Sequence, residues 1–276
     1  MKNILKKLNK KILNISLFII KKHMEKQPDM YIYTYKRKLD QLVPIVAYKA
    51  RDITNIDNNK LSETNNFEHI NNLINYSNKI VIDVGAALGG TVIPFSKKSK
   101  MVYAFEPQQD NYLFLLDQIK IRKLKNIQTY NSAVSNFNGS AEFYNRESHG
   151  VHSLGVHNKG RILSSLQTRV VRLDDFWKDN INKQIGLLKI DVEGFESDVL
   201  EGASYLLKNN KIDAIIFEFS PKIHKLRGIE LDAPIKILKK YNYSVFTIDG
   251  GEFEFNKDNY PKICDLIAKP SERIDI

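Results

Sequence analysis

The chain has 276 residues, of which 42% are hydrophobic and 27% charged, and a formal net charge of +10. This length and composition are those of a globular protein with a full hydrophobic core, and the single cysteine, Cys264, excludes an internal disulfide. Eight lysines and one acidic residue fall within residues 1–26, so the remainder of the chain lacks the basic surface that nucleic-acid binding requires.

Residues 1–30 predict a basic amphipathic helix. The apolar run at 12–20 is shorter than the roughly 20 residues that span a bilayer, and two lysines follow it where a signal peptide would carry small residues. One helix face collects the apolar residues Leu5, Leu8, Ile12, Ile15 and Ile19. Two placements stay open: the helix lies on an anionic membrane surface, or it packs on the protein or on a second copy in a homodimer. The expected location is the cytoplasm, at the inner membrane face in the first case.

Residues 31–77 predict a cap or linker ahead of the main domain. The segment 31–50 has a mixed amphipathic pattern, which we assign only to a cap. The segment 52–78 is rich in asparagine and reads as a loop around one short helix that carries Phe67, Ile70 and Ile74.

Residues 78–276 alternate apolar strands with amphipathic helices. Helices are expected after the glycine-rich residues 85–90, after Pro107 and over 195–208, and two extra strands, 139–144 and 168–173, flank a long polar loop. Strands separated by helices predict an α/β fold with a seven-stranded, mostly parallel sheet covered on both faces. The seven predicted strands are Lys79–Val84, Met101–Glu106, Ile127–Val134, Gly186–Asp191, Asp213–Phe219, Tyr243–Ile248 and Ile263–Ala268.

The ends of the first two strands predict a nucleoside-binding site, because ligands of open parallel sheets bind at the carboxyl ends of the strands. The first strand runs through Asp83 into a turn that contains Gly85 and Gly89, and the second ends at Glu106, twenty-one residues after Gly85. An acid at that distance can accept hydrogen bonds from the ribose hydroxyls of an adenosine cofactor.

Two cofactors fit this turn, S-adenosylmethionine and NAD. A dinucleotide needs a glycine through which the backbone approaches the pyrophosphate, but that position holds Ala87, and Asp83 would repel an anion. A sulfonium cofactor is cationic and tolerates nearby carboxylates. The residues therefore favour S-adenosylmethionine, with an NAD-dependent oxidoreductase acting on a sugar as the alternative.

The segment 189–196, Lys-Ile-Asp-Val-Glu-Gly-Phe-Glu, concentrates charge at the end of the fourth strand. Strand alternation places Lys189, Asp191 and Glu193 on one side, and Glu218 adds an acid to the same rim from the fifth strand. Interior strand ends rarely collect acids for stability alone, so Asp191 and Glu193 are functional candidates. For Glu196 we expect a role in capping and charging the first turn of helix 195–208.

The ordered motifs resemble those of the FkbM-type methyltransferase family over residues 78–250. They are Asp83-Val84-Gly85-Ala86-x-x-Gly89, Ala104-Phe105-Glu106-Pro107, Asn131-Ser132-Ala133-Val134-Ser135 with Gly139, Leu173-Asp174, and the segment 189–196. The resemblance implies a Rossmann-like methyltransferase fold, S-adenosylmethionine as donor, and O-methylation of a hydroxyl on a sugar, glycan or secondary metabolite. Ala87 departs from the family, whose members commonly have asparagine there.

Site roles follow from the resemblance together with the residue pattern. The cofactor residues are Asp83, Gly85, Gly89, Glu106, Ser132 and Ala133, with the glycines around the methionine moiety, Glu106 at the ribose and the last two near the adenine. The catalytic candidates are Asp191 or Glu193 as the base, which takes the acceptor proton, and Glu218, which orients the acceptor.

Three alternatives to this assignment stay open. No metal ligand is assigned, and Mg²⁺ held by the same acids is the second interpretation. Histidines could replace the acidic base: His149, His152 and His157 of the long loop, and His224. A catalytically decayed methyltransferase fold that serves as a binding module at a membrane is the remaining non-enzymatic alternative.

Overall fold

The computed structural model describes residues 31–38, 41–49, 73–146, 154 and 162–271. The chain divides into two compact units, Met1–Ser62 and Glu63–Ile276. In the first unit, β1 (Tyr31–Lys38) and β2 (Gln41–Lys49) form an antiparallel hairpin where the sequence analysis assigned only a cap. Both strands are rich in the tyrosine, isoleucine and valine that favour extended backbone. The predicted N-terminal helix and most of the asparagine-rich segment lie outside the described residues.

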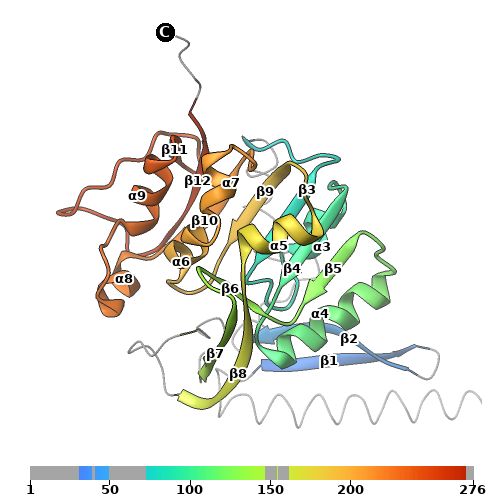
Figure 1. The fold of residues 1–276 in the computed structure, drawn as a ribbon. Helices are drawn as coiled ribbons and strands as arrows, with labels where there is room; N and C mark the ends of the chain where they lie inside the picture. The colour runs from blue at the N-terminus through green and yellow to red at the C-terminus, as the bar shows by residue number, and fades with distance from the viewer. Residues whose placement is uncertain (1–30, 39–40, 50–72, 147–153, 155–161, 272–276) are drawn as a thin grey trace, which may run out of the picture. The chain divides into compact units, whose positions relative to one another are not determined.

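The second unit contains one large sheet, one small sheet and seven helices among its described residues (Figure 1). No helix of the described part is long and apolar enough to cross a membrane. The elements in chain order are β3 (Ile80–Val84), α3 (Val92–Ser96), β4 (Met101–Phe105), α4 (Gln109–Arg122), β5 (Ile127–Tyr130), β6 (Ala133–Ser135), β7 (Gly139–Arg146), β8 (Ile162–Arg172), α5 (Leu173–Asn180), β9 (Ile185–Ile190), α6 (Glu196–Glu201), α7 (Ser204–Lys208), β10 (Ile215–Phe219), α8 (Pro221–Arg227), α9 (Ala233–Lys240), β11 (Tyr243–Thr247) and β12 (Cys264–Pro270).

The large sheet has seven strands in the order β11-β12-β10-β9-β3-β4-β5. Only β12 runs antiparallel to its neighbours, so the predicted seven-stranded, mostly parallel sheet is confirmed. The chain builds outward from β3 through β4 to β5, then returns to add β9 and β10 on the other side of β3. The strand order therefore reverses between β3 and β9, and the carboxyl ends of these two strands mark the expected ligand site.

Alternate residues of the buried strands face two separate cores. Ile82 and Val84 of β3 belong to a cluster with Val199 and Leu200 of α6, whereas Val81 packs in a second cluster on the opposite face, which also contains Val92, Phe95 and Leu115 of α3 and α4. The sheet is thus covered on both faces, as predicted for a buried parallel sheet.

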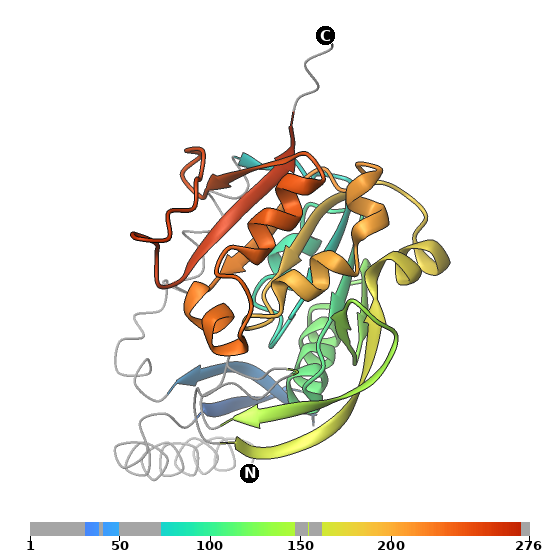
Figure 2. The same cartoon turned by 60° about the vertical axis from the view of Figure 1, so that its left-hand side comes forward.

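The predicted strand Ile127–Val134 is wrong as a single element. It divides at Asn131 and Ser132 into β5 of the large sheet and β6 of a three-stranded sheet ordered β6-β8-β7. The Asn131 side-chain amide donates to the carbonyls of Glu106 and Pro107 at 2.8 and 3.1 Å. These bonds end the pairing with β4 and redirect the chain. Figure 2 shows β7 and β8 as a long ribbon that projects from the body of this unit.

The predicted helix 195–208 is likewise two helices, α6 and α7. Between them Gly202 packs so closely on β6 that a Cβ atom there would lie 2.1 Å from the Ser135 carbonyl oxygen. Asp174 of α5 then caps α7, because its carboxylate accepts hydrogen bonds from the Tyr205 and Leu206 backbone amides at 2.9 and 3.1 Å. Both causes are tertiary, so the helical spacing of the apolar residues did not reveal the break.

Candidate active site

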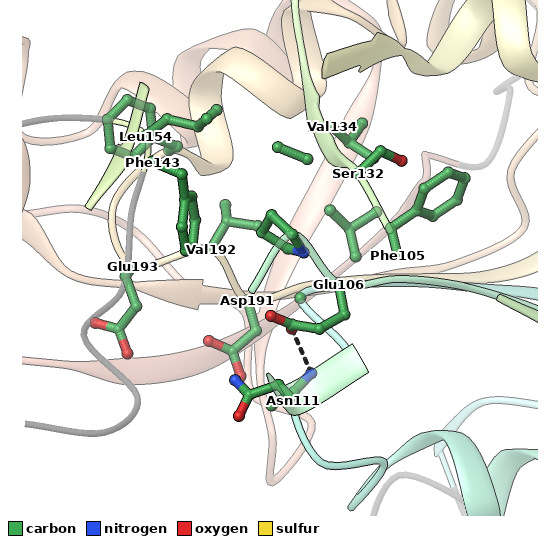
Figure 3. Close-up of a pocket in the computed structure, with 16 residues that line it drawn as sticks. Phe105, Glu106, Asn111, Ser132, Val134, Phe143, Leu154, Asp191, Val192 and Glu193 are labelled. Atoms are coloured by element: carbon green, nitrogen blue, oxygen red, sulfur yellow. Dashed lines mark hydrogen bonds between the residues drawn. The ribbon is translucent and has the colours of Figure 1, made fainter. Parts of the chain in front are cut away.

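A cavity of about 730 Å³, open to solvent, lies at the carboxyl ends of β3, β4 and β9. In Figure 3 the carboxylates of Glu106, Asp191 and Glu193 lie along one side, and Phe143 and Leu154 lie across from them. Phe143 comes from β7, so the small sheet contributes to the wall. The lining residues are Val84, Gly85, Ala87, Phe105, Glu106, Pro107, Asn111, Ser132, Ala133, Val134, Phe143, Leu154, Asp191, Val192, Glu193 and Phe195.

Six of the predicted site residues line this cavity, and three do not. Asp83, Gly89 and Glu218 are not among its lining residues. Those that are lining residues come from four strand ends: Gly85, Glu106, Ser132, Ala133, Asp191 and Glu193. The sequence analysis missed the apolar wall, including Phe143, Leu154 and Phe195, because nothing in the spacing of these residues distinguishes them from ordinary core residues.

Glu106 is held in place by backbone amides on both sides. Its two carboxylate oxygens accept hydrogen bonds from Ala87 and Gln108, each at 2.8 Å. Ala87 takes a left-handed conformation with φ of +45°, which aims its N–H at the carboxylate. Burial raises the pKa of Glu106 to about 7, although the hydrogen bonds from Gln108 and Ala87 oppose the rise. The carboxylate is therefore pre-oriented at the tip of β4.

Gly85 is required where β3 meets β9. Its φ is +83°, and a Cβ atom there would lie 1.8 Å from the Asp191 carbonyl oxygen. Gly89 closes the same turn with φ of +92°, and its Cβ position lies 2.7 Å from Leu115 of α4. The two glycines thus shape the turn that lines the cavity, Gly85 from the cavity wall and Gly89 from behind it.

Asp83 is fully buried behind the wall and forms an ion pair with Lys189. The lysine Nζ lies 3.2 Å from an Asp83 oxygen, 3.2 Å from the Gly85 carbonyl oxygen and 3.4 Å from an Asp191 oxygen. Asp83 also accepts a hydrogen bond from the Thr91 hydroxyl. Lys189 therefore fastens the tip of β3 to the tip of β9. Since its charge is paired, Asp83 repels an incoming anion less than the sequence argument supposed.

The side chains of Asp191, Glu193 and Glu218 converge, with one carboxylate oxygen of each within 4.8 Å of the others. Burial, reinforced by the charges of Asp191 and Glu193, raises the pKa of Glu218 to about 9. Glu218 accordingly carries a proton at neutral pH and can donate a hydrogen bond. Three carboxylates at this spacing are also a donor set that suits a hard divalent cation.

The turn that carries these acids is folded by Glu196. One of its oxygens accepts hydrogen bonds from the Val192 and Gly194 amides at 3.2 and 3.0 Å. Glu193 and Gly194 both adopt positive φ, +55° and +94°. Glu196 lies in the first turn of α6, as expected. Its carboxylate also folds the turn before the helix, where it determines how Asp191 and Glu193 are presented.

Of the alternative histidine bases, only His224 falls within the described residues. His224 is fully buried, and it is not among the residues that line the cavity. His149, His152 and His157 lie outside the described residues.

Comparison with known proteins places this geometry in context. The profile of the methyltransferase FkbM domain matches residues 83–245, more than half of the chain. No curated protein has a significantly similar sequence.

Three of the similar solved structures are methyltransferases. Methyltransferase FkbM from Methylobacillus flagellatus is 15% identical, with a TM-score of 0.48, over 72% of this chain and 45% of that one, so this chain spans less than half of that protein. An S-adenosylmethionine-dependent methyltransferase from Clostridium acetobutylicum is 11% identical, with a TM-score of 0.44, over 79% and 94% of the two chains. Magnesium protoporphyrin IX methyltransferase from Synechocystis, with bound SAM, is 12% identical, with a TM-score of 0.42, over 76% and 77%.

Proposed function

The chain belongs to the FkbM methyltransferase family, and we propose that it transfers the methyl group of S-adenosylmethionine to a hydroxyl group of a sugar, a glycan or a secondary metabolite. One observation carries the choice of donor: the described residues that line the cavity include three carboxylates and neither a lysine nor an arginine. Such a wall attracts a sulfonium cation and disfavours the pyrophosphate of a dinucleotide. Family membership and this charge pattern both argue against the NAD-dependent alternative.

The residues present fit S-adenosylmethionine. Glu106 would accept hydrogen bonds from the ribose hydroxyls, the turn at Gly85 would lie against the methionine part, and Ser132 and Ala133 would lie beside the adenine, facing the apolar wall. When bound, the cofactor supplies a methyl group already activated by the positive sulfur.

The protein has two further tasks: it aligns the acceptor with the methyl group, and it removes the proton of the acceptor hydroxyl. Holding the acceptor oxygen in line with the methyl group contributes up to about 7–11 kcal/mol, and a positioned base about 10²–10⁴-fold in rate. Asp191 and Glu193 face the cavity, so either can take the hydroxyl proton. Glu218 does not line the cavity, so it would orient the acceptor through Asp191 and Glu193, on which its carboxyl group converges.

Two substitutions separate binding from chemistry. Glu106→Ala should weaken the binding of S-adenosylmethionine by about tenfold or more, because charge-assisted hydrogen bonds contribute about 1.5–3 kcal/mol. Asp191→Asn should keep that binding and remove turnover. Calorimetry measures the first, and a mass-spectrometric screen for the gain of one methyl group across glycans and nucleotide sugars measures the second.

Each outcome of this experiment bears on the proposal. Equal loss of turnover in both variants, with cofactor binding intact in both, would contradict the two role assignments. If the unmodified protein bound no S-adenosylmethionine at millimolar concentration, the enzymatic proposal would fail in favour of a decayed fold that serves as a binding module. Tight binding of NADH, measured by the same calorimetry, would favour the alternative function of an NAD-dependent oxidoreductase.

A further inference from the structure

Helix α8 packs directly on the turn that presents Asp191 and Glu193. A Cβ atom on Gly194 would lie 2.3 Å from Cγ2 of Ile223, so the helix and the turn are in close contact. Arg227, one turn further along α8, donates to the Gly194 carbonyl and to the Asp198 carboxylate, the latter at 2.8 Å, and its guanidinium lies 3.6 Å from the centre of the Phe195 ring. The helix therefore braces residues 194–198 through several side chains.

His224, a buried residue of α8, lies between Ile223 and Arg227 along the helix. His224 and Glu196 are both fully buried, and the His224 Nε2 atom lies 3.6 Å from one Glu196 oxygen, Oε2. On its other side, the His224 Nδ1 atom lies 2.8 Å from the Leu231 carbonyl oxygen. A carbonyl oxygen only accepts, so Nδ1 carries a hydrogen and donates it. Neither Nε2 nor this Glu196 oxygen has another hydrogen-bond partner in the described part of the chain.

The His224 Nε2 and Glu196 Oε2 atoms, 3.6 Å apart, attract each other only when one of them carries a proton. With the hydrogen on Nδ1 committed to Leu231, a neutral imidazole would turn the Nε2 lone pair toward a carboxylate. Two buried acceptors that face each other repel, and a charge left unpaired there would cost several kcal/mol. One proton on either atom turns the repulsion into attraction. The pair then neutralises the buried Glu196 and holds its carboxyl group in one orientation.

We propose that His224 is a positioning residue for methyl transfer: through Glu196 it fixes the turn 191–194 and with it the carboxylates that act on the acceptor. The contacts that connect His224 to this turn are continuous. His224 holds one oxygen of Glu196, the other oxygen accepts from the Val192 and Gly194 amides, and these amides flank Glu193. The inference concerns this chain's own residues, although its catalytic consequence rests on the proposed function.

Two substitutions of His224 distinguish positioning from simple packing. In His224→Asn the side-chain amide can reach the place of Nδ1 and donate to Leu231, but it leaves Glu196 without a partner. In His224→Gln the longer side chain can place its amide nitrogen where Nε2 stood and donate to Glu196. Both remove the ring and its edge contact with Phe219, so both should lower the melting temperature, to a similar extent.

Two readouts on the full chain test the proposal, and the first needs no activity. Amide hydrogen exchange of the segment 191–195, without cofactor, should speed up at least tenfold in His224→Asn and stay near the unmodified rate in His224→Gln. The kcat for methyl transfer should fall by about 10- to 100-fold in His224→Asn, with the Kd for S-adenosylmethionine changed less than threefold, and His224→Gln should recover most of kcat.

Exchange rates that match in the two variants would overturn the positioning role, whatever the activity. A kcat that follows the melting temperature in both variants would do the same. If the unmodified protein transfers no methyl group, the proposed function fails, while the exchange experiment still decides the role of His224.

Discussion

Acidic side chains that share one edge of the sheet have different charges because their surroundings differ. Asp83 is buried but lies beside Lys189, whereas Glu218 is buried among other acids and keeps its proton. Asp191 and Glu193 project into the cavity. The sequence showed that acids gather here; only the structure shows which of them is neutralised and how.

Glu218 should make the stability of the protein depend on pH. Its pKa is about 9 in the folded chain and near 4.5 when unfolded, so folding binds a proton between these values. This contribution is complete below the unfolded pKa and is lost as the pH rises toward 9. From pH 8 to 9, where the titration of Glu106 is largely past, the free energy of unfolding should fall by up to about 1.4 kcal/mol per pH unit.

Glu218→Gln, which imitates the protonated form, should remove most of that decline. Urea unfolding at pH 7, 8 and 9 measures it in both proteins. Parallel declines in the two would show that Glu218 is ionised in the folded state at neutral pH.

A side chain at Gly85 should destabilise the protein by more than its positive φ alone implies, because the backbone there lies close to the Asp191 carbonyl. Gly85→Ala adds both positive-φ strain and a collision with the Asp191 carbonyl, which must separate β3 from β9. Gly228→Ala is the matched control, because Gly228 also has positive φ, +71°, but no atom lies within 4 Å of its Cβ position.

We expect about 1–2 kcal/mol of destabilisation from the control and at least twice that from Gly85→Ala. The Gly85 variant should also lose affinity for S-adenosylmethionine. Chemical unfolding and calorimetry measure the two effects, and equal destabilisation by both substitutions would show that the contact relaxes freely.

At the scale of elements, the local sequence pattern correctly predicted the strands whose formation depends on burial in the large sheet. The buried runs 80–84, 101–105 and 185–190 are strands as expected, because runs made mostly of β-branched and apolar residues fit a sheet covered on both faces. The errors occur where a single side chain acts across the fold. Asn131 stops a strand that its apolar neighbours would continue, and Asp174 starts a helix in the middle of a helical pattern. Neither effect has a local signature.

The cap that Asp174 provides to α7 should contribute to stability and leave the chemistry unaffected. Its carboxylate accepts from the Tyr205 and Leu206 amides and from the Ser204 hydroxyl, and it pairs with Arg172 at 2.9 Å. Asp174→Ala leaves the buried Leu206 amide, and the partly buried bonds of Tyr205 and Ser204, without this acceptor, so the free energy of unfolding should fall by about 2–4 kcal/mol.

Asp175→Ala is the control for this prediction. Asp175 is the next residue of the same helix, but its side chain is 45% exposed, so the change should cost less than about 1 kcal/mol. Urea unfolding compares the two, and the Kd for S-adenosylmethionine should be the same in both. A large loss of cofactor affinity in Asp174→Ala would mean that α7 supports the site as well as the fold.

At the scale of the whole molecule, the charge of the chain and the charge of its cavity have opposite signs. The chain carries +10, yet within the described part of the chain the only ionisable residues that line the cavity are acids. The excess of lysine in residues 1–26 accounts for most of the net positive charge. Those residues belong to the first unit of the chain, whereas the cavity belongs to the second. Net charge alone would have suggested a polyanion as substrate; its distribution along the sequence separates the basic segment from the catalytic one.

This separation leads to the proposal that residues 1–26 attach the protein to anionic membranes without taking part in methyl transfer. Deletion of these residues should abolish sedimentation with vesicles that contain anionic lipid and leave kcat unchanged. Each lysine near such a surface contributes about 1 kcal/mol, and the attraction is screened by salt. Binding of the full chain should therefore weaken steeply between low and physiological ionic strength.

A second variant separates charge from the apolar face. Replacing Lys6, Lys7, Lys10 and Lys11 with glutamine keeps the apolar residues at helical spacing, so a helix that packs on protein would be retained whereas one that binds lipid through charge would be released. Loss of vesicle binding in both the deletion and the glutamine variant, with the oligomeric state unchanged, supports the membrane role. Unchanged vesicle binding after the deletion would refute it, and dissociation of a dimer in the deletion alone would assign the segment to the contact between two copies of the chain.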